Sequence, residues 1–486
     1  MDHPYLKPGP SDDAPLYLQL YRRYRDAIAT GKLRAGERVP SVRSLASELN
    51  LARGTVELAY QMLTSEGYFD PRGAAGTFVS PRLEHVGETP SSPTTPAPRA
   101  RAHRDAMATG GSPRPFQLGL PALDAFPRKT WVRLAGRRLR MMDLVSLSYP
   151  EPAGYLPLRH AIATYLGISR GIACTAEQVF VTPGYRAALD LVCRTLIAPG
   201  AHGWFEDPGY PYARHFLTSI GMRLASIPVD EEGLDVDYGV RHAPNARFAV
   251  VTPTHQSPMG TTLSLPRRLT LLDWAARQQS WIVEDDYDSE FRYHGRPLPA
   301  LKSLDHDDRV LYTGTFSKVL FPGLRLAYLV VPAAHIDRFA AAADQLGGPA
   351  SVPVQATVAD FMEQGHFARH LRKMRTLYAE RRKWLVEALD RVFPDDFYVQ
   401  PQAGGIQTLA YLKHNTGPNT TLNAARPYDV SIADAAHAQG LAVHALSCWY
   451  SEQPARSGLL MGFTNIPDQA TAMALSQRLK AAIATL

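Results

Sequence analysis

The chain has 486 residues, 45% of them hydrophobic and 20% charged, and its formal net charge is +6. This length predicts two or three domains, and the mild positive charge is compatible with a polyanionic partner without requiring one. The three cysteines form no CxxC pair, which indicates reduced thiols and no metal site. The sequence has no apolar run of about 18 residues and no signal-peptide pattern, so we expect a cytoplasmic protein without a membrane span.

The first predicted unit, residues 15–80, begins with two helices. In the first helix, apolar side chains recur every four residues before the chain reaches Gly31, namely Leu16, Leu20, Tyr24 and Ile28. A second, shorter helix is predicted to be capped by Ser41 and to end at a turn formed by Asn50 and Leu51.

A third helix is predicted from about Arg53, and a hairpin with Gly73 and Gly76 at its turn follows it. The inward side chains of this helix are Val56, Tyr60 and Leu63. Its outward side chains are Arg53, Thr55, Glu57 and Gln61. Two short helices joined by a tight turn, followed by a two-stranded wing, form the helix-turn-helix plan, in which the second helix of the pair enters a major groove of double-stranded DNA.

The predicted DNA-facing side chains lie on both helices of this pair and on the wing. Arg53 is placed near base edges, whereas Arg43 and Arg72 are placed to meet phosphates. The full predicted set is Arg43, Arg53, Thr55, Gln61 and Arg72. The unit holds nine Lys or Arg residues against six Asp or Glu, a modest excess. The alternative is a three-helix interaction module that never meets DNA.

The unit closely resembles the GntR-type winged helix-turn-helix over nearly its whole length. The shared elements are "LYxQL", "GxLxxGxRxPSxRxLA", "RxTVxxAYxxLxxEGY" and "GxxGTFV". The resemblance implies a DNA-binding domain with operator DNA as its partner. Ala52 departs from the pattern, because a serine or threonine is frequent there; this change would remove a phosphate contact without altering the fold.

Residues 81–114 differ sharply in composition from what precedes and follows them. They contain six prolines, no aromatic residue, and no helical or strand period. This composition predicts a flexible, proline-rich linker between two domains.

Residues 115–486 alternate short apolar runs with helical patterns. The runs are "QVFVTPG", "HGWFEDPG", "RFAVVTPT", "SWIVEDDY" and "RVLYTGT", and a helical stretch such as "LPRRLTLLDWAARQQ" lies between two of them. This alternation predicts an α/β domain with a mostly parallel sheet. Ligands bind such sheets at the carboxyl ends of the strands, where these runs become polar.

A reactive role for Lys318, in "GTFSKVLFPGLR", is indicated by an acidic strand end upstream in the chain. A lysine that reacts with an aldehyde must be unprotonated, and desolvation favours that state. Asp285 lies at the end of the apolar run in "IVEDDYD", where a carboxylate can keep a pyridinium nitrogen protonated. Tyr287 lies two residues on, on the same side of the strand, and is placed to bond the hydroxyl of the same ring.

Several further residues predict a phosphate and a flat ring in the same site. "TPGYRAALDLV" is a glycine turn that opens a helix, so its backbone N–H groups can hold a phosphate. Arg325, Thr315 and Ser317 are placed to complete that cradle. Tyr210, on the turn in "EDPGYPY", is placed to stack on the ring. Together these features describe a site for a phosphorylated, aldehyde-bearing pyridine.

The order and spacing of these motifs resemble the class I/II aminotransferases of fold type I, which depend on pyridoxal 5′-phosphate (PLP), over residues 115–486. The resemblance implies an α/β fold with a small C-terminal α+β subdomain. It implies that Lys318 forms the Schiff base, that Asp285 pairs with the pyridine nitrogen and that Tyr287 contacts the 3′-oxygen. Tyr210 becomes the stacking aromatic. The implied phosphate ligands are Gly184, Tyr185, Arg186, Thr315, Ser317 and Arg325.

The same resemblance places Tyr155, in "GYLPLR", where this fold sends a tyrosine to the phosphate of a neighbouring subunit, which implies at least a homodimer. The two units on one chain resemble the MocR branch of the GntR regulators. "TPTHQSPMG", "EDDYDSEFRY" and "GTFSKVLFPGLR" are close to the wording of that branch.

Two residues depart from the enzymes. Leu460 stands where an arginine usually binds the α-carboxylate of the substrate, and a leucine cannot do so. Ser257 stands where asparagine is common, which weakens one contact with the cofactor. Arg456, four residues before Leu460, is a candidate substitute for the missing arginine.

We therefore expect a transcription regulator associated with the nucleoid, whose aminotransferase-like domain senses PLP itself or a PLP–amine adduct and so controls vitamin B6 or amino-compound metabolism. The first rival is an active aminotransferase with an appended DNA-binding domain. The second rival is a scaffold that takes no cofactor.

Overall fold

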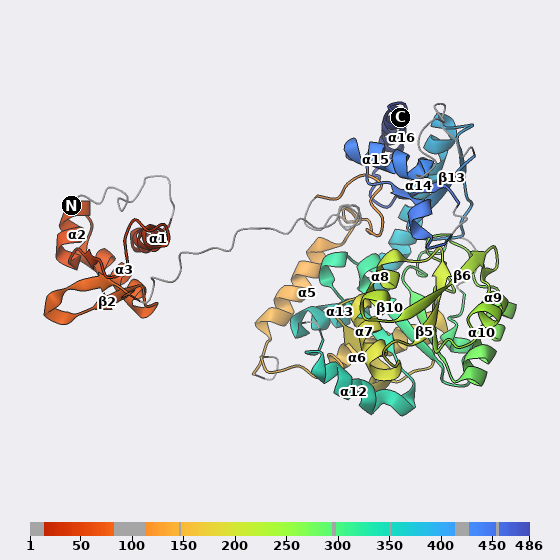
Figure 1. Ribbon diagram of the computed structural model, residues 1–486, viewed down its shortest axis with the longest axis horizontal. Coiled ribbons are helices and arrows are strands. Elements are labelled where there is room, and N and C mark those ends of the chain that lie inside the picture. The colour runs from red at the N-terminus through yellow and green to blue at the C-terminus, as the bar shows by residue number, and fades with distance from the viewer. Residues whose placement is uncertain are drawn as a thin grey trace. The chain divides into compact units, whose positions relative to one another are not determined.

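The computed structural model describes residues 14–81, 112–144, 147–293, 298–349, 351–413, 427–452 and 456–486. The chain divides into two compact units, residues 1–98 and 99–486, each with its own core (Figure 1). The predicted linker, residues 81–114, lies almost entirely outside the described residues. Within the described part of the chain, no helix has both the length and the apolar content that crossing a bilayer demands.

The N-terminal unit combines three helices with a three-stranded antiparallel sheet. The helices are α1 (Leu16–Ala29), α2 (Val42–Leu49) and α3 (Arg53–Ser65). The strands are β1 (Arg38–Val39), β2 (Phe69–Pro71) and β3 (Thr77–Val79), in the order β1-β3-β2. The predicted wing is present as β2 and β3. Strand β1 was not predicted, because two residues are too few to show an alternating pattern.

The core of this unit differs from the predicted stripe on α1. Leu20 and Tyr24 are buried, but Leu16 is 47% exposed and Ile28 is half-buried. A strict four-residue spacing drifts around a helix of 3.6 residues per turn, so the outer two positions leave the buried face. The Tyr24 ring packs edge-on against the rings of Tyr60 and Phe69, which joins α1, α3 and β2.

The turn between α2 and α3 forms as predicted. The Ser41 hydroxyl accepts a hydrogen bond of 3.1 Å from the backbone N–H of Ser44, which caps α2. Asn50 ends α2 in the left-handed conformation, with φ at 53°, a geometry that asparagine tolerates well. Ala52 begins α3 without a side-chain cap.

The large unit is built on an eight-stranded sheet with the order β4-β11-β10-β9-β8-β5-β6-β7. The strands are β4 (Val179–Thr182), β5 (His202–Asp207), β6 (Arg223–Asp230), β7 (Gly233–Leu234), β8 (Phe248–Val251), β9 (Trp281–Asp286), β10 (Val310–Thr315) and β11 (Ala327–Val330). All five predicted strands are present. The pairs β10–β9, β9–β8, β8–β5 and β5–β6 are parallel, whereas β11 and β7 run antiparallel to their neighbours.

Helices cover both faces of this sheet. Successive side chains of a strand point to opposite faces, and because both sets are buried, each face packs against helices. Phe180 of β4 packs in the same apolar cluster as residues of α7 (Tyr185–Leu196), α8 (Pro211–Ser219) and α12 (Ile336–Gln345). Its neighbours Val179 and Val181 pack on the opposite face with α6 (Leu156–Arg170) and α13 (Val352–Glu363). Other helices that precede the C-terminal part are α5 (Arg128–Arg140), α9 (Val236–His242), α10 (Leu265–Gln278) and the one-turn α11 (Phe316–Val319).

A smaller C-terminal α+β part follows, as predicted. Its antiparallel sheet has the order β12-β13-β15-β14. Its strands are β12 (Phe397–Val399), β13 (Gln407–Leu412), β14 (His444–Ala445) and β15 (Gly458–Gly462). The long helix α14 (His366–Val392) leads into this part. Helix α16 (Gln469–Ile483) packs against α14, and α15 (Tyr428–Ala438) packs against α16 and β14.

Candidate cofactor site

The predicted site residues of the large unit follow strands that end at one edge of the sheet. Lys318 follows β10, Asp285 is the next-to-last residue of β9, the segment from Thr252 to Ser257 follows β8, and Tyr210 follows β5. These four strands are neighbours and run parallel, so their carboxyl ends meet at the same edge. This is the edge at which α/β sheets bind ligands.

Lys318 lies on α11, immediately after β10. The Thr315 hydroxyl caps this helix by accepting a hydrogen bond of 3.1 Å from the N–H of Ser317. The Lys318 amine is half-buried and donates a hydrogen bond of 2.9 Å to the carbonyl of Gly119. Burial lowers the pKa of Lys318, whereas Asp288 and Asp285 oppose that shift. A buried amine with a lowered pKa is a better nucleophile than a surface lysine.

Gly119 is required where it meets Lys318. Its φ is +74°, a conformation that other residues rarely adopt, and a Cβ there would lie 2.4 Å from the Lys318 Nζ. A side chain at this position would displace the amine.

Asp285 is one of the two buried acidic groups, with Asp288, whose charge acts on Lys318. It pairs with Thr313 of β10 in the parallel register, and burial raises its pKa to about 8, while the Tyr185 hydroxyl opposes that shift. A carboxyl group with a raised pKa ionises readily once a positive group is placed against it. The arrangement suits a protonated pyridine nitrogen.

The predicted anion cradle lies at the start of α7. Gly184 is the N-cap residue of this helix, with φ at 110°, and a Cβ there would lie 3.3 Å from the Arg325 Nη2. The same Nη2 atom donates to the carbonyl of Pro183 at 3.4 Å. A helix N-terminus beside a guanidinium attracts a phosphate.

Two predicted phosphate ligands take different positions around this cradle. The Tyr185 hydroxyl is buried without a good hydrogen bond among the described residues, although Asp285 lies beside it. The Arg186 guanidinium lies over the Phe216 ring, 5.1 Å from its centroid, so this side chain packs on the surface of α8. Any contribution of Arg186 to the cradle therefore comes from its backbone N–H.

Tyr210 and Tyr155 border the same region. Tyr210 is the N-cap residue of α8, and its ring centroid lies 6.1 Å from that of Trp449. Burial raises the pKa of Tyr210, and the nearby Asp285 carboxylate raises it further. Tyr155 is the half-buried N-cap residue of α6, and its backbone N–H donates to the Gln355 side chain at 2.8 Å.

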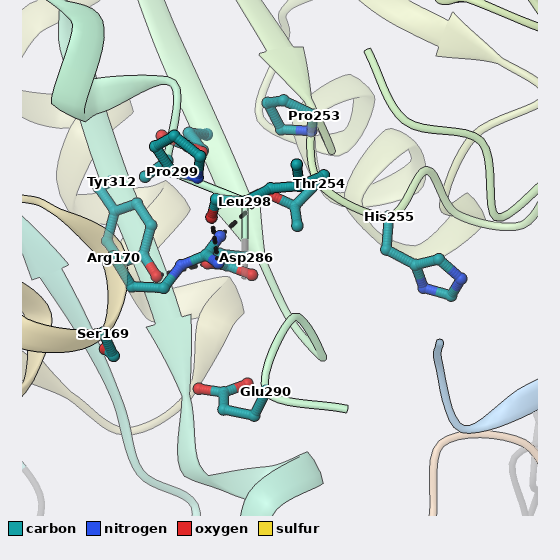
Figure 2. Close-up of polar contacts among 12 residues, drawn as sticks. Ser169, Arg170, Pro253, Thr254, His255, Asp286, Glu290, Leu298, Pro299 and Tyr312 are labelled. Carbon is teal, nitrogen blue, oxygen red and sulfur yellow. Dashed lines mark hydrogen bonds and ion pairs between the residues drawn. The ribbon is translucent and has the colours of Figure 1, made fainter. Parts of the chain in front are cut away.

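A buried ion pair that the sequence did not reveal holds the end of β9. Arg170, the last residue of α6, forms a 2.6 Å ion pair with Asp286, and both side chains are almost fully buried. The Arg170 guanidinium also donates to the Thr254 hydroxyl and to the carbonyl of Leu298, each at 2.9 Å, as Figure 2 shows. Burial lowers the pKa of Arg170, but Asp286, Tyr312, Glu284 and Glu290 together raise it by more, so the group stays charged.

The chain after β8 is fixed by a second buried carboxyl. Glu206, on β5, accepts hydrogen bonds from the N–H of Thr252 at 3.0 Å, from the Thr252 hydroxyl at 2.6 Å, and from the Gln256 amide at 3.1 Å. Burial raises the pKa of Glu206 to about 7, and these hydrogen bonds oppose the shift. Ser257, the predicted weak contact, is buried in this segment.

The position of the missing arginine is filled by an apolar cluster. Leu460 is fully buried on β15, where it pairs with Leu409 and His444. The cluster consists of Leu118, Met259, Leu409, Leu446, Trp449 and Leu460, and Tyr210 packs against it. Arg456 is exposed and lies over the Tyr411 ring, 5.9 Å from its centroid. It therefore does not occupy the place of the missing arginine.

The predicted DNA-facing residues all lie on the α2–α3 pair and the wing. Arg43, Arg53 and Gln61 are exposed, whereas Thr55 is half-buried. Arg72 forms a 2.9 Å ion pair with Asp70 and lies over the Phe78 ring.

The chain combines a winged helix with an aminotransferase-like domain of the fold that binds PLP. This combination defines a cofactor-binding transcription regulator. The family model "Aminotransferase class I and II" matches residues 132–448, and "Bacterial regulatory proteins, gntR family" matches residues 16–79. The chain belongs to the MocR subfamily of the GntR regulators, and the cofactor of its large unit is PLP, as predicted.

Three relatives support this assignment. The probable rhizopine catabolism regulatory protein MocR of Rhizobium meliloti is 37% identical over 93% of this chain and 91% of its own length. The pyridoxine biosynthesis regulator PdxR of Corynebacterium glutamicum is 31% identical over 94% of this chain and 93% of its own. The crystal structure of a multiple substrate aminotransferase from Thermococcus profundus superposes with a TM-score of 0.69 at 27% identity, covering 81% of this chain and 96% of that one.

Proposed function

We propose that this chain is a regulator whose large unit holds PLP on Lys318 in order to sense, and that its winged helix carries the response to operator DNA in the nucleoid. The observation that carries the proposal is Leu460, which is buried in an apolar cluster where an aminotransferase keeps the arginine for its substrate. The residues proposed to bind the cofactor, among them Lys318, Asp285 and Tyr287, are all present in the chain. In this proposal, residues 15–80 bind DNA, residues 81–114 link the units and residues 115–486 form the effector domain.

Each residue of the site has a proposed role that rests on its position. Lys318 supplies the amine, and Asp285 holds a proton on the pyridine nitrogen. Tyr287 contacts the 3′-oxygen, and Tyr210 covers one face of the ring. Arg325 and the N-terminus of α7 hold the phosphate, together with Thr315 and Ser317. Bound PLP supplies an aldehyde that condenses with amines and a ring that accepts electrons.

The apolar cluster also bears on what the site senses. A carboxylate placed against Leu460 would lose its hydration without gaining a partner, which is costly. This favours PLP itself, or an amine without a carboxylate at that position, over an α-amino acid. An amine that condenses with PLP would free the Lys318 amine and so bias the unit between two conformations.

Residual enzymatic activity is the second candidate function. Lys318, Asp285 and Tyr287 are all present, so conversion of an amine to its carbonyl product has the groups that it needs. Sustained turnover of any amino acid with a keto-acid acceptor would favour the enzyme.

A homodimer is proposed from an exposed apolar surface beside Tyr155. Large apolar side chains crowd the solvent-facing side of α5 and the residues after it, namely Val132, Leu139, Met141, Leu144, Leu147 and Tyr149. Single exposed apolar residues are ordinary, but a contiguous group marks an interface. In the proposed dimer, Tyr155 reaches the phosphate of the neighbouring subunit, as the resemblance to the aminotransferases implies.

We expect Leu144→Asp to convert the dimer to a monomer, because a carboxylate in the centre of an apolar interface would be desolvated without a partner. Light scattering on the full chain measures this directly against the monomer mass of 53.5 kDa. Leu265→Asp, on an exposed position of α10, is the matched control and should leave the mass unchanged. A monomeric wild-type chain would contradict the proposal.

We expect Arg53→Ala to weaken binding to a DNA fragment that the full chain selects from a random pool. Loss of one base contact corresponds to about 1–3 kcal/mol, or roughly 5- to 150-fold in affinity. Arg25→Ala, an exposed arginine on α1, serves as control and should change the affinity less than about twofold. Equal effects of the two substitutions would place the DNA on another face of this unit.

A further inference from the structure

Three polar groups meet at one nitrogen of His255, a residue to which the proposed roles above assign nothing. Its Nδ1 lies 2.9 and 3.1 Å from the two carboxylate oxygens of Asp288 and 3.1 Å from the Tyr287 hydroxyl oxygen. The His255 side chain is 10% exposed and that of Asp288 is fully buried. Figure 2 shows the His255 ring pointing away from Arg170, whereas its neighbour Thr254 points toward it.

The partners of this ring determine which nitrogen carries the hydrogen. An ionised carboxylate only accepts hydrogen bonds, so Nδ1 donates to Asp288. Nε2 is buried without a hydrogen-bond partner among the described residues and faces Gly405. A buried N–H without a partner costs more than an unused lone pair, which also places the hydrogen on Nδ1. A Cβ on Gly405 would lie 2.3 Å from the ring, so this glycine fixes its position.

The consequence falls on Tyr287. Because the Nδ1 lone pair is not available, the Tyr287 hydroxyl can accept from His255 but cannot donate to it. Burial raises the pKa of Tyr287 and Asp288 raises it further, while a hydrogen bond with the Ser257 side chain opposes the shift. The hydrogen of the hydroxyl therefore points away from His255.

We propose that His255, held by Asp288, is a positioning residue that keeps the Tyr287 hydroxyl as a hydrogen-bond donor to the 3′-oxygen of PLP. The proposal rests on the proposed function, because it needs PLP on Lys318. A donor at that oxygen draws charge from it and weakens its attraction for the proton on the Lys318 nitrogen. His255 thereby sets the pH midpoint at which the visible absorption of the bound cofactor changes.

Other charged groups shift the pKa of the Tyr287 hydroxyl, so they must be the same in every variant that is tested. They are Asp285 on β9, Asp288 just after that strand and Glu206 on β5. Substitutions at His255 leave all three in place.

The test is a pH titration of the visible absorption of the full chain loaded with PLP. Tyr287→Phe gives the reference, because it removes the donor and should raise the midpoint. His255→Gln, which has no donor at the Nδ1 position, should raise the midpoint in the same direction by about half to one pH unit, the effect of one hydrogen bond. His255→Asn places an N–H near the Nδ1 position and should remain within about 0.2 units of wild type.

The controls separate this proposal from the function on which it rests. Borohydride reduction and mass spectrometry establish that each variant carries PLP on Lys318, and thermal melts of the apoproteins establish folding. If His255→Gln fails to fold, His255→Leu takes its place with the same expected shift. A wild-type midpoint in the Gln or Leu variant, with Tyr287→Phe shifted, would overturn the role of His255 alone. A wild-type chain that takes up no PLP would overturn both proposals.

Discussion

Lys318→Ala is expected to abolish the visible absorption band that PLP acquires on a lysine, and to leave no cofactor attached after borohydride reduction. The substitution removes an amine that is half-buried against Gly119 and whose pKa burial lowers. PLP would then be held by the phosphate and ring contacts alone. We expect its affinity to fall at least about tenfold, the equivalent of about 1.4 kcal/mol. Absorption spectra and equilibrium dialysis of the full chain measure both effects.

The control for this prediction is a second buried lysine. Burial also lowers the pKa of Lys302, whose amine donates to the carbonyl of Val310 at 2.6 Å, outside the predicted cofactor site. Lys302→Ala should keep the absorption band and the attached cofactor. Attachment that persists in Lys318→Ala, or that disappears in Lys302→Ala, would show that the reactive amine has been assigned to the wrong residue.

Arg170→Leu should strongly destabilise the large unit. It leaves Asp286 buried without its 2.6 Å partner and removes the donors to Thr254 and Leu298. Breaking a buried ion pair by removing one partner costs about 3–5 kcal/mol. For a unit of this size, that corresponds to about 4–6 °C in the midpoint of thermal unfolding. Calorimetry on the full chain resolves the transition of the large unit.

Two further variants test the physical reason. Adding Asp286→Asn to Arg170→Leu removes the unpaired charge and should recover part of the lost stability. Arg277→Ala breaks an exposed ion pair with Asp273 on α10 and should change the midpoint by less than about 1 °C. If the Arg170→Leu protein has the same midpoint of thermal unfolding as the wild type, the pair contributes no net stability.

The strands and the cofactor-facing edge could be predicted because their signals are local. Each apolar run of the large sheet ends at a polar residue, and the parallel order places those ends together. Lys318, Asp285 and Tyr210 could therefore be assigned to one site from the sequence alone. The short strand β1 and the true inward face of α1 could not, because two residues show no period and a four-residue spacing drifts around the helix.

The supporting residues could not be predicted for a different reason. Arg170 ends an ordinary helix, and its partner Asp286 lies far along the chain on β9. His255 depends on Asp288, on Tyr287 and on a glycine of the C-terminal part. Nothing local distinguishes such residues from any buried arginine or histidine. Their role arises from contacts that only the tertiary structure brings together.

The central claim is that the large unit senses PLP and that the winged helix reports it. The most direct measurement is the affinity of the full chain for its selected DNA fragment, at fixed salt, with and without PLP, in wild type and Lys318→Ala. We predict that PLP changes the wild-type affinity by roughly 5- to 150-fold, the usual range of allosteric coupling, and that Lys318→Ala does not respond. Equal affinity in all four conditions would contradict the claim.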